Sequence, residues 1–176
     1  MLEADRNLYE TVLEIPKPTI AMIDGYAFGG GFELALACDL RVASDDSVFA
    51  MPESKIGMGA NFGSVVLPRL IPRALALEIL YFGERHPAAR LLEIGLLNAV
   101  WDKTELAERV EKWTDDLATR APLTLQRYKH MTLKGWELPL AANLRLDVGP
   151  NPYTSADRIE GTTAFREKRP PKWQGR

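Results

Sequence analysis

Apolar and polar residues follow two patterns along the chain, one typical of buried strands and the other of amphipathic helices. The segment 19–24, Thr-Ile-Ala-Met-Ile-Asp, is apolar almost throughout, as in a strand covered on both faces, and Gly25 ends it. We predict shorter strands at 40–44, 47–51 and 97–101, with a loop at 52–57. We predict helices at 2–14, from residue 32 onward, in two or three pieces between 61 and 83, and at 87–94, 105–120, 122–133, 138–148 and 155–168.

Prolines set several of these boundaries. Pro16 and Pro18 end the first helix, because a proline inside a helix removes a hydrogen bond and clashes with the preceding turn. Pro68 and Pro72 interrupt the apolar stretch after residue 61, so we expect separate short helices there. The pattern favours an α/β protein with strand-and-turn units up to residue 101 and a helical module after it.

Three consecutive glycines, Gly29, Gly30 and Gly31, precede the helix that contains Glu33 in its first turn. Their bare backbone leaves N–H groups free at the helix N-terminus, where negative charge is favoured, and this geometry can stabilise an oxyanion. Two simpler explanations stay open. The glycines could form a tight turn or a close contact between strand and helix, and the glutamate could complement the helix dipole.

Charge and composition exclude several other classes of protein. Lys and Arg total 22 against 24 Asp and Glu, a formal net charge of −2, so no overall basic field would attract nucleic acid or an anionic membrane. The single cysteine, Cys38, and two distant histidines provide neither an intrachain disulfide framework nor a zinc site. No segment approaches the roughly 20 apolar residues of a membrane span, and the first residues lack the pattern of a signal peptide. We expect a cytoplasmic protein that binds no metal, nucleic acid or membrane.

The run at 24–39, Asp-Gly-Tyr-Ala-Phe-Gly-Gly-Gly-Phe-Glu-Leu-Ala-Leu-Ala-Cys-Asp, resembles the signature of the crotonase (enoyl-CoA hydratase/isomerase) superfamily. The resemblance continues through 49–53, Phe-Ala-Met-Pro-Glu, through Gly57 and into the tail at 157–169, so it covers almost the whole chain. It implies an α/β fold in which a partial spiral of ββα units, residues 1–101, precedes a C-terminal helical module, residues 102–176. In the family this module packs subunits into trimers, often paired into hexamers.

The resemblance also implies roles for individual residues. Glu33 and Glu53 stand where hydratases of the family carry two catalytic glutamates, although Glu53 taken alone would be a solvated loop charge. Gly30 stands where one oxyanion donor lies. The loop at 61–63, Asn-Phe-Gly, replaces the family's usual Pro-Gly-x-Gly-Gly beside the acyl pocket. The residues implied in substrate binding are Ala27, Phe28 and Gly29 near the turn, Ala60 and Phe62 in the pocket wall, and Phe165 and Lys168 against coenzyme A.

The first third that members of the family usually have finds no counterpart in this sequence. That third contains the Ala-Gly-Ala-Asp-like loop that supplies the second oxyanion donor in the family. We therefore expect a fragment of a longer enzyme, with weak or no turnover from the 176-residue chain by itself.

The implied activity is hydration of a 2-enoyl-CoA thioester to a 3-hydroxyacyl-CoA, with coenzyme A entering as part of the substrate and no separate cofactor. This reaction needs a base that activates water toward the β-carbon and an acid that protonates the α-carbon, and two glutamates can fill both roles. Two alternatives within the family stay open: enoyl-CoA isomerisation, which typically uses the glutamate equivalent to Glu53 alone, and acyl-CoA hydrolysis. A third is a non-catalytic oligomeric module that binds coenzyme A.

Overall fold

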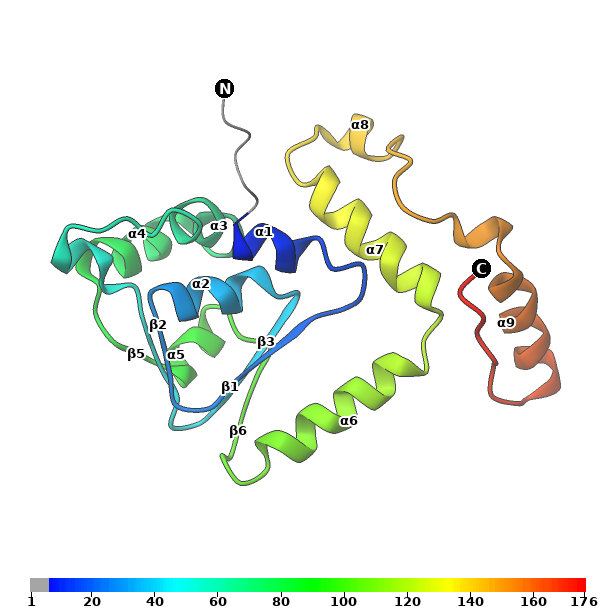
Figure 1. Ribbon diagram of the computed structural model, residues 1–176, viewed down its shortest axis with the longest axis horizontal. Coiled ribbons are helices and arrows are strands. Elements are labelled where there is room, and N and C mark those ends of the chain that lie inside the picture. The colour runs from blue at the N-terminus through cyan, green and yellow to red at the C-terminus, as the bar shows by residue number, and fades with distance from the viewer. Residues whose placement is uncertain (1–6) are drawn as a thin grey trace. The chain divides into compact units, whose positions relative to one another are not determined.

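The computed structural model describes residues 7–176, which form two compact units (Figure 1). The first unit contains helix α1 (Leu8–Leu13) and Thr19–Glu111, and the second contains Pro16–Pro18 and Lys112–Arg176. Within the described residues no helix is long and apolar enough to cross a membrane.

The first unit is built on two three-stranded sheets. One sheet is entirely parallel, with β1 (Ile20–Ile23), β3 (Leu40–Ser44) and β6 (Ala99–Trp101) in the order β1-β3-β6. In the other, β2 (Tyr26–Phe28) pairs parallel with β4 (Val48–Ala50), which pairs antiparallel with β5 (His86–Pro87). The first four strands along the chain therefore alternate between the two sheets.

Short turns carry the chain from one sheet to the other. Gly25, between β1 and β2, has a φ of 100°, a conformation that glycine adopts more readily than other residues. The side chain of Ser47, just before β4, ties the two turns together: its hydroxyl donates to Ile23 O at 3.1 Å and accepts from Gly25 N at 3.1 Å. A helix follows β1 and β2, and helical segments follow β3 and β4, which produces two successive ββα units.

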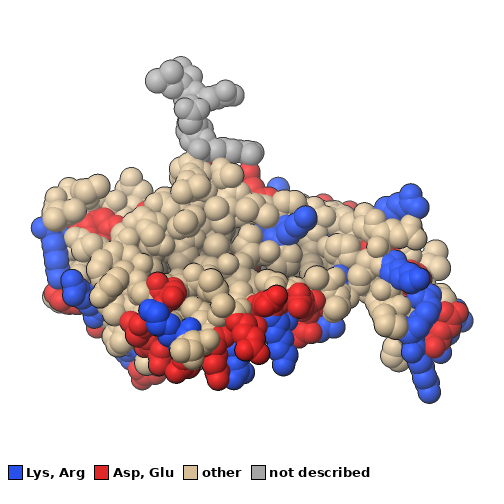
Figure 2. Space-filling view, turned by 60° about the horizontal axis from the view of Figure 1, so that its bottom comes forward, with Lys and Arg blue, Asp and Glu red and all other residues tan. Residues whose placement is uncertain are grey.

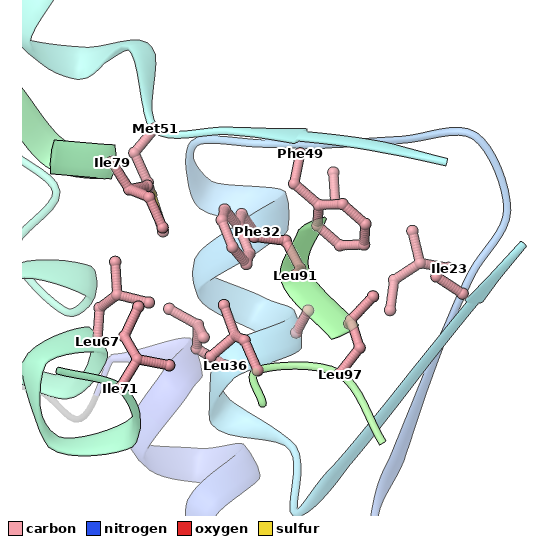
Figure 3. Packing of buried hydrophobic residues seen from close by; sticks show 14 of the residues in the cluster. Ile23, Phe32, Leu36, Phe49, Met51, Leu67, Ile71, Ile79, Leu91 and Leu97 are labelled. Carbon is pink, nitrogen blue, oxygen red and sulfur yellow. The ribbon is translucent and has the colours of Figure 1, made fainter. Parts of the chain in front are cut away.

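Helix α2 (Gly30–Ala37) lies against the core of the first unit. Its Phe32 meets Phe49 of β4 with ring centroids 5.2 Å apart, and both rings are fully buried. Figure 3 shows these rings close to Leu91, with Leu36 on the next turn of α2. Burying one such side chain stabilises the fold by about 1.5–3 kcal/mol, so the core fixes the orientation of α2. The other helical segments here are α3 (Gly63–Leu70), α4 (Arg73–Phe82), α5 (Ala88–Glu93) and the 3₁₀ turn η1 (Pro52–Ile56).

The second unit is helical. Its C-terminal tail folds back on the last helix, where the Asp157 carboxylate accepts from Gln174 N at 2.6 Å and from Gly175 N at 3.0 Å. The indole N–H of Trp173 donates to Thr119 O at 2.8 Å. The segments are α6 (Leu106–Ala118), which begins in the first unit, α7 (Pro122–Gly135), α8 (Leu140–Asn143), the 3₁₀ turn η2 (Pro152–Thr154) and α9 (Ala156–Glu167).

Acidic and basic side chains are interleaved on the surface. Figure 2 shows both signs alternating along one edge of the face that it displays. Lys103 illustrates this mixing, since its Nζ lies 2.9 Å from Asp24 Oδ1 and 3.1 Å from Asp46 Oδ2. This distribution agrees with the small net charge of −2.

Most predicted elements are present, but one prediction about β1 is wrong for the described residues. Met22, in the middle of this strand, is 50% exposed, so β1 is not covered on both faces. It forms one edge of its sheet. The first helix is observed as Leu8–Leu13, and residues 1–6 of the predicted helix lie outside the described part of the chain.

Three further predictions need correction. Pro68 does not separate two helices but lies inside α3, near its end, where the missing N–H removes a single hydrogen bond. The segment 138–148 is helical only at Leu140–Asn143. The expected loop at 52–57 is the 3₁₀ turn η1, which places Glu53 in a defined first turn.

Candidate active site

The glycine turn ends β2 and begins α2 (Gly30–Ala37). Gly29 is the N-cap residue, with φ 51° and ψ −123°, and its N–H donates to Ala50 O at 2.9 Å, which anchors the turn to β4. Within residues 7–176 no side chain caps α2, and Gly30 and Gly31 at its start are exposed. Because the first N–H groups of a helix have no partner within the helix, this end of α2 can receive an anion.

Glu33 lies in the first turn of α2 and is only 6% exposed. Its Oε1 accepts a hydrogen bond from the N–H of Gly63, at the start of α3, over 2.7 Å. A Cβ on Gly63 would lie 3.0 Å from Met51 Cε and 3.4 Å from the same glutamate oxygen. The close approach of α3 to this carboxylate therefore depends on glycine.

Glu53 reaches the same turn from η1. Its Oε1 lies 2.8 Å from the position that a Cβ on Gly29 would occupy. Its Oε2 is buried and has no hydrogen-bond partner among the residues described. Buried polar atoms without hydrogen-bond partners are uncommon in proteins, and such atoms often occur at functional sites. Here the unpaired atom is a carboxyl oxygen of Glu53, beside the N-terminus of α2.

Helix α1 places Tyr9 beside both glutamates. The ring of Tyr9 stacks on Phe62, with centroids 4.9 Å apart and an interplanar angle of 29°. Its hydroxyl lies 3.1 Å from the position of a Cβ on Gly30. Burial raises the pKa of the Tyr9 phenol above its ordinary value, and a hydrogen bond to Glu33 and the negative charges of Glu33 and Glu53 raise this pKa further. The structure thus brings the Tyr9 hydroxyl to Glu33 at the glycine turn, which Glu53 also reaches.

The other residues predicted near the turn differ in accessibility. Ala27 and Ala60 are buried members of the hydrophobic core, so their side chains pack in the core of the first unit. Phe28 is partly buried, in an edge contact with Tyr26, and the guanidinium of Arg85 lies 5.6 Å from the centre of its ring. Phe62 is partly buried against Tyr9.

Phe165 and Lys168 belong to the second unit, which contains the end of α9. The ring of Phe165 is 85% exposed. Lys168 is the C-cap of α9, with a φ of 54°, and is also exposed. Both side chains are accessible in their own unit.

Two parts of the site were not found from the sequence, Tyr9 and the N–H of Gly63. Tyr9 follows Leu8, one of the apolar positions that predict α1, and its spacing does not distinguish it from a surface aromatic. Gly63 lies in the loop that departs from the family pattern, and that departure is the one signal that pointed to it.

Two glutamates, a tyrosine hydroxyl and the open N-terminus of a helix meet on a frame of ββα units. This combination can transfer protons beside a developing negative charge, and the frame is that of the crotonase fold. Residues 1–176 match the sequence profile described as enoyl-CoA hydratase/isomerase, and the chain belongs to this family.

Individual relatives agree with this assignment. The chain is 38% identical over 172 residues to a carnitinyl-CoA dehydratase of Salmonella typhi, an alignment that covers 94% of the chain and 66% of that protein. The crystal structure of an enoyl-CoA hydratase from Bacillus anthracis superimposes with a TM-score of 0.88 at 31% identity, over 96% of the chain and 66% of that structure. An enoyl-CoA hydratase from Mycobacterium tuberculosis gives a TM-score of 0.85 at 36% identity, over 93% and 67%. The predicted family and fold class are confirmed, and the chain spans 66% of the length of the curated relative.

Proposed function

We propose that the protein containing this chain adds water to a 2-enoyl-CoA thioester and so forms a 3-hydroxyacyl-CoA. The observation that carries the proposal is the position of both carboxyl groups at the glycine turn: Glu33 lies in the first turn of α2, and Glu53 Oε1 lies 2.8 Å from where a Cβ on Gly29 would stand. Hydration needs one group that accepts a proton and one that donates a proton, and the two glutamates supply this pair.

Glu33 is the better candidate for the base. An ionised carboxylate accepts hydrogen bonds and donates none, and Glu33 faces two donors, the N–H of Gly63 and the hydroxyl of Tyr9. In the proposed reaction Glu33 takes a proton from water while the water oxygen bonds to the β-carbon. Glu53, whose Oε2 has no partner among the described side chains and backbone, gives a proton to the α-carbon from its protonated form. One proton enters the pair and one leaves it, so its total charge is unchanged.

Gly30 is the proposed donor to the thioester oxygen. As water adds, the electrons of the double bond move toward this oxygen, which acquires negative charge. The N–H of Gly30, an exposed residue at the start of α2, can stabilise that charge, and a donor of this kind is worth about 10²–10³ in kcat.

The remaining predicted residues take supporting roles in this proposal. We assign Ala27, Phe28, Gly29, Ala60 and Phe62 to the surroundings of the acyl group, close to the glutamates. Phe165 and Lys168 would contact coenzyme A, since an accessible lysine suits its phosphates and an accessible aromatic ring suits its adenine. Coenzyme A enters with the substrate, and no separate cofactor is proposed.

The helical part, residues 102–176, is proposed as the module through which copies of the chain form a trimer or hexamer. Family membership supports this role, and the exposed ring of Phe165 shows apolar surface on the module.

Hydration of crotonyl-CoA by the natural protein that contains this chain tests the proposal. We expect Glu53→Gln to lower kcat by about 10²–10⁴, because an amide cannot supply the proton to the α-carbon. Glu108→Gln serves as a matched control, since Glu108 is an exposed residue of α6 in the same unit. Full activity of the Glu53→Gln protein would contradict the assignment.

Glu33→Gln separates hydration from isomerisation. Hydration requires both glutamates, so this variant should lose crotonyl-CoA hydration by a factor similar to that of Glu53→Gln. An enzyme that shifts a double bond with Glu53 alone would retain that activity in the Glu33→Gln protein. Binding of coenzyme A without turnover of any thioester would instead support a non-catalytic module.

A second substrate deserves the same assay, because the Salmonella typhi relative is named a carnitinyl-CoA dehydratase. Dehydration of a 3-hydroxyacyl-CoA is hydration in reverse, so the same pair of carboxylates can carry it. The aromatic pair of Tyr9 and Phe62 beside two glutamates also suits a quaternary ammonium group. We expect the ratio of kcat/KM for carnitinyl-CoA over 3-hydroxybutyryl-CoA to show whether this cationic group is recognised, and a ratio below one would exclude it.

A further inference from the structure

Tyr9 belongs to α1, a helix in which the sequence predicts no functional residue. The start of α1 is fixed by a capping box in which Asn7 Oδ1 accepts from Glu10 N at 2.9 Å and Asn7 N donates to Glu10 Oε2 at 3.0 Å. Tyr9 lies one residue before Glu10, inside this capped first turn. Its backbone is therefore held in a defined conformation rather than at a fraying helix end.

Two contacts then hold the side chain of Tyr9. The ring stacks on Phe62 with centroids 4.9 Å apart, a geometry typical of favourable aromatic pairs. The hydroxyl lies 3.1 Å from where a Cβ on Gly30 would stand, so the absence of a side chain at that glycine gives the hydroxyl its room. The ring and the hydroxyl are thus both constrained, and the hydroxyl is directed to the first turn of α2.

Glu33 occupies that first turn and already accepts a hydrogen bond from Gly63 N at 2.7 Å. The charged groups that act on the Tyr9 phenol are Glu33 of α2 and Glu53 of η1, and its strongest side-chain interaction is the hydrogen bond to Glu33. These influences raise the pKa of the phenol, so Tyr9 remains a protonated donor at neutral pH. Gly63 and Tyr9 therefore hold the Glu33 carboxylate from α3 and from α1.

We propose that Tyr9 is a positioning residue: its ring stacks on Phe62, and its hydroxyl donates a hydrogen bond to the Glu33 carboxylate. Together these contacts fix the direction from which Glu33 meets the reacting water. The proposal rests on the proposed function for its consequence in catalysis, while the contact itself is independent of that function. Phe62 belongs to the wall of the proposed acyl pocket. Its stacking on Tyr9 therefore connects that wall to the residue that orients Glu33, the proposed base.

The contact is tested first without any reaction, by NMR titration of the protein with ¹³C placed at the hydroxyl-bearing carbon of tyrosine. The Tyr9→Phe variant identifies the signal of Tyr9. Removing the charge of Glu33 makes ionisation of the phenol easier, so Glu33→Gln should lower the Tyr9 midpoint, and Glu53→Gln should lower it less. Glu10→Gln is the matched control, because glutamine keeps the capping box on the same helix. An unchanged Tyr9 midpoint in Glu33→Gln overturns the proposal.

The catalytic consequence is tested with Tyr9→Phe, which keeps the stacking ring and removes only the hydroxyl. Loss of one hydrogen bond to a charged group should lower kcat for crotonyl-CoA hydration about tenfold to a hundredfold, with KM within about twofold of the wild type. Tyr81→Phe is the control, since Tyr81 is exposed on α4 in the same unit. In a Glu33→Gln background, Tyr9→Phe should have no further effect, because the partner that it positions is already lost.

The outcomes separate this proposal from the proposed function. If the wild-type protein does not hydrate enoyl-CoA thioesters, the proposed function fails, and the NMR titration alone decides whether Tyr9 holds Glu33. If the wild type is active and Tyr9→Phe retains full kcat, the positioning role is wrong while the proposed function stands. A rise in KM with unchanged kcat also overturns it, because such a change would place Tyr9 in substrate binding instead.

Discussion

At the scale of single residues, Gly29 joins backbone conformation to the placement of Glu53, the proposed acid. Its φ of 51° disfavours any side chain, and a Cβ at this position would lie 2.8 Å from Glu53 Oε1. A contact that short cannot persist, and Glu53 would have to move. We predict that Gly29→Ala loses about 1–2 kcal/mol in the free energy of unfolding, and that kcat falls about 10²-fold because the acid is displaced.

Gly95→Ala is the matched control for this prediction. Gly95, in the same unit, also has a positive φ, of 78°, but no described atom lies within 4 Å of where its Cβ would stand. It should therefore lose stability while retaining kcat. Urea unfolding gives the stability of each variant, and crotonyl-CoA hydration per mole of folded protein gives kcat. Equal kcat in both variants would show that the position of Glu53 does not depend on Gly29.

At the scale of elements, the short strand β5 carries a histidine whose burial predicts a dependence of stability on pH. His86 pairs with Phe49 of β4, and its Nε2 is buried without a hydrogen-bond partner among the described residues. Burial lowers the pKa of the His86 imidazole and outweighs the neighbouring charges, of which Glu78 and Glu84 raise this pKa and Arg90 lowers it.

The sign of the effect follows from the direction of the shift. The unfolded chain binds a proton at His86 with a pKa near its ordinary value of about 6.5, and the folded protein binds it less readily. Stability is therefore fully present above that pH and falls as the pH is lowered through it. We predict that His86→Gln flattens this decline in urea unfolding between about pH 8 and pH 5. The same slope in wild type and variant would assign the decline to other groups.

Elements that depend on local spacing were predictable, whereas those that depend on partners were not. Alternation of apolar and polar residues predicts the strand at 40–44, which the structure confirms, and amphipathic spacing predicts 105–120, observed as Leu106–Ala118. Pro68 was assigned the wrong role because its cost is small at the end of a helix, and sequence spacing does not show where that end falls.

The candidate site divides in the same way. Glu33, Glu53 and Gly30 follow from a resemblance to a known family, because the residues that carry it form two short continuous segments, the glycine turn with the start of α2 and the segment from β4 into η1. Tyr9 follows from neither spacing nor motif. Its importance arises only when α1 packs beside α2, which places its hydroxyl near Gly30. The sequence did not predict such contacts between segments that are distant along the chain.

At the scale of the whole molecule, the second unit exposes large apolar side chains that a protein in solution usually covers. Leu140 is 74% exposed and Leu144 is 76% exposed, and they lie four residues apart at α8 and its C-cap, so they fall on the same side. Exposed apolar surface of this kind is typical of sites of association. Membership in the enoyl-CoA hydratase/isomerase family makes further copies of the same chain the expected partners.

We therefore predict that light scattering coupled to size exclusion gives the mass of three or six chains for the natural protein. Replacing both Leu140 and Leu144 with Glu should shift the mass toward that of a single chain, because charged side chains oppose burial in an interface, while circular dichroism stays unchanged. Lys112→Glu, a charge reversal at an exposed position of the same unit, should leave the assembly intact. A wild-type protein that remains a monomer at micromolar concentration would contradict the role proposed for residues 102–176. An intact oligomer in the double variant would instead place the interface on other surfaces of the chain.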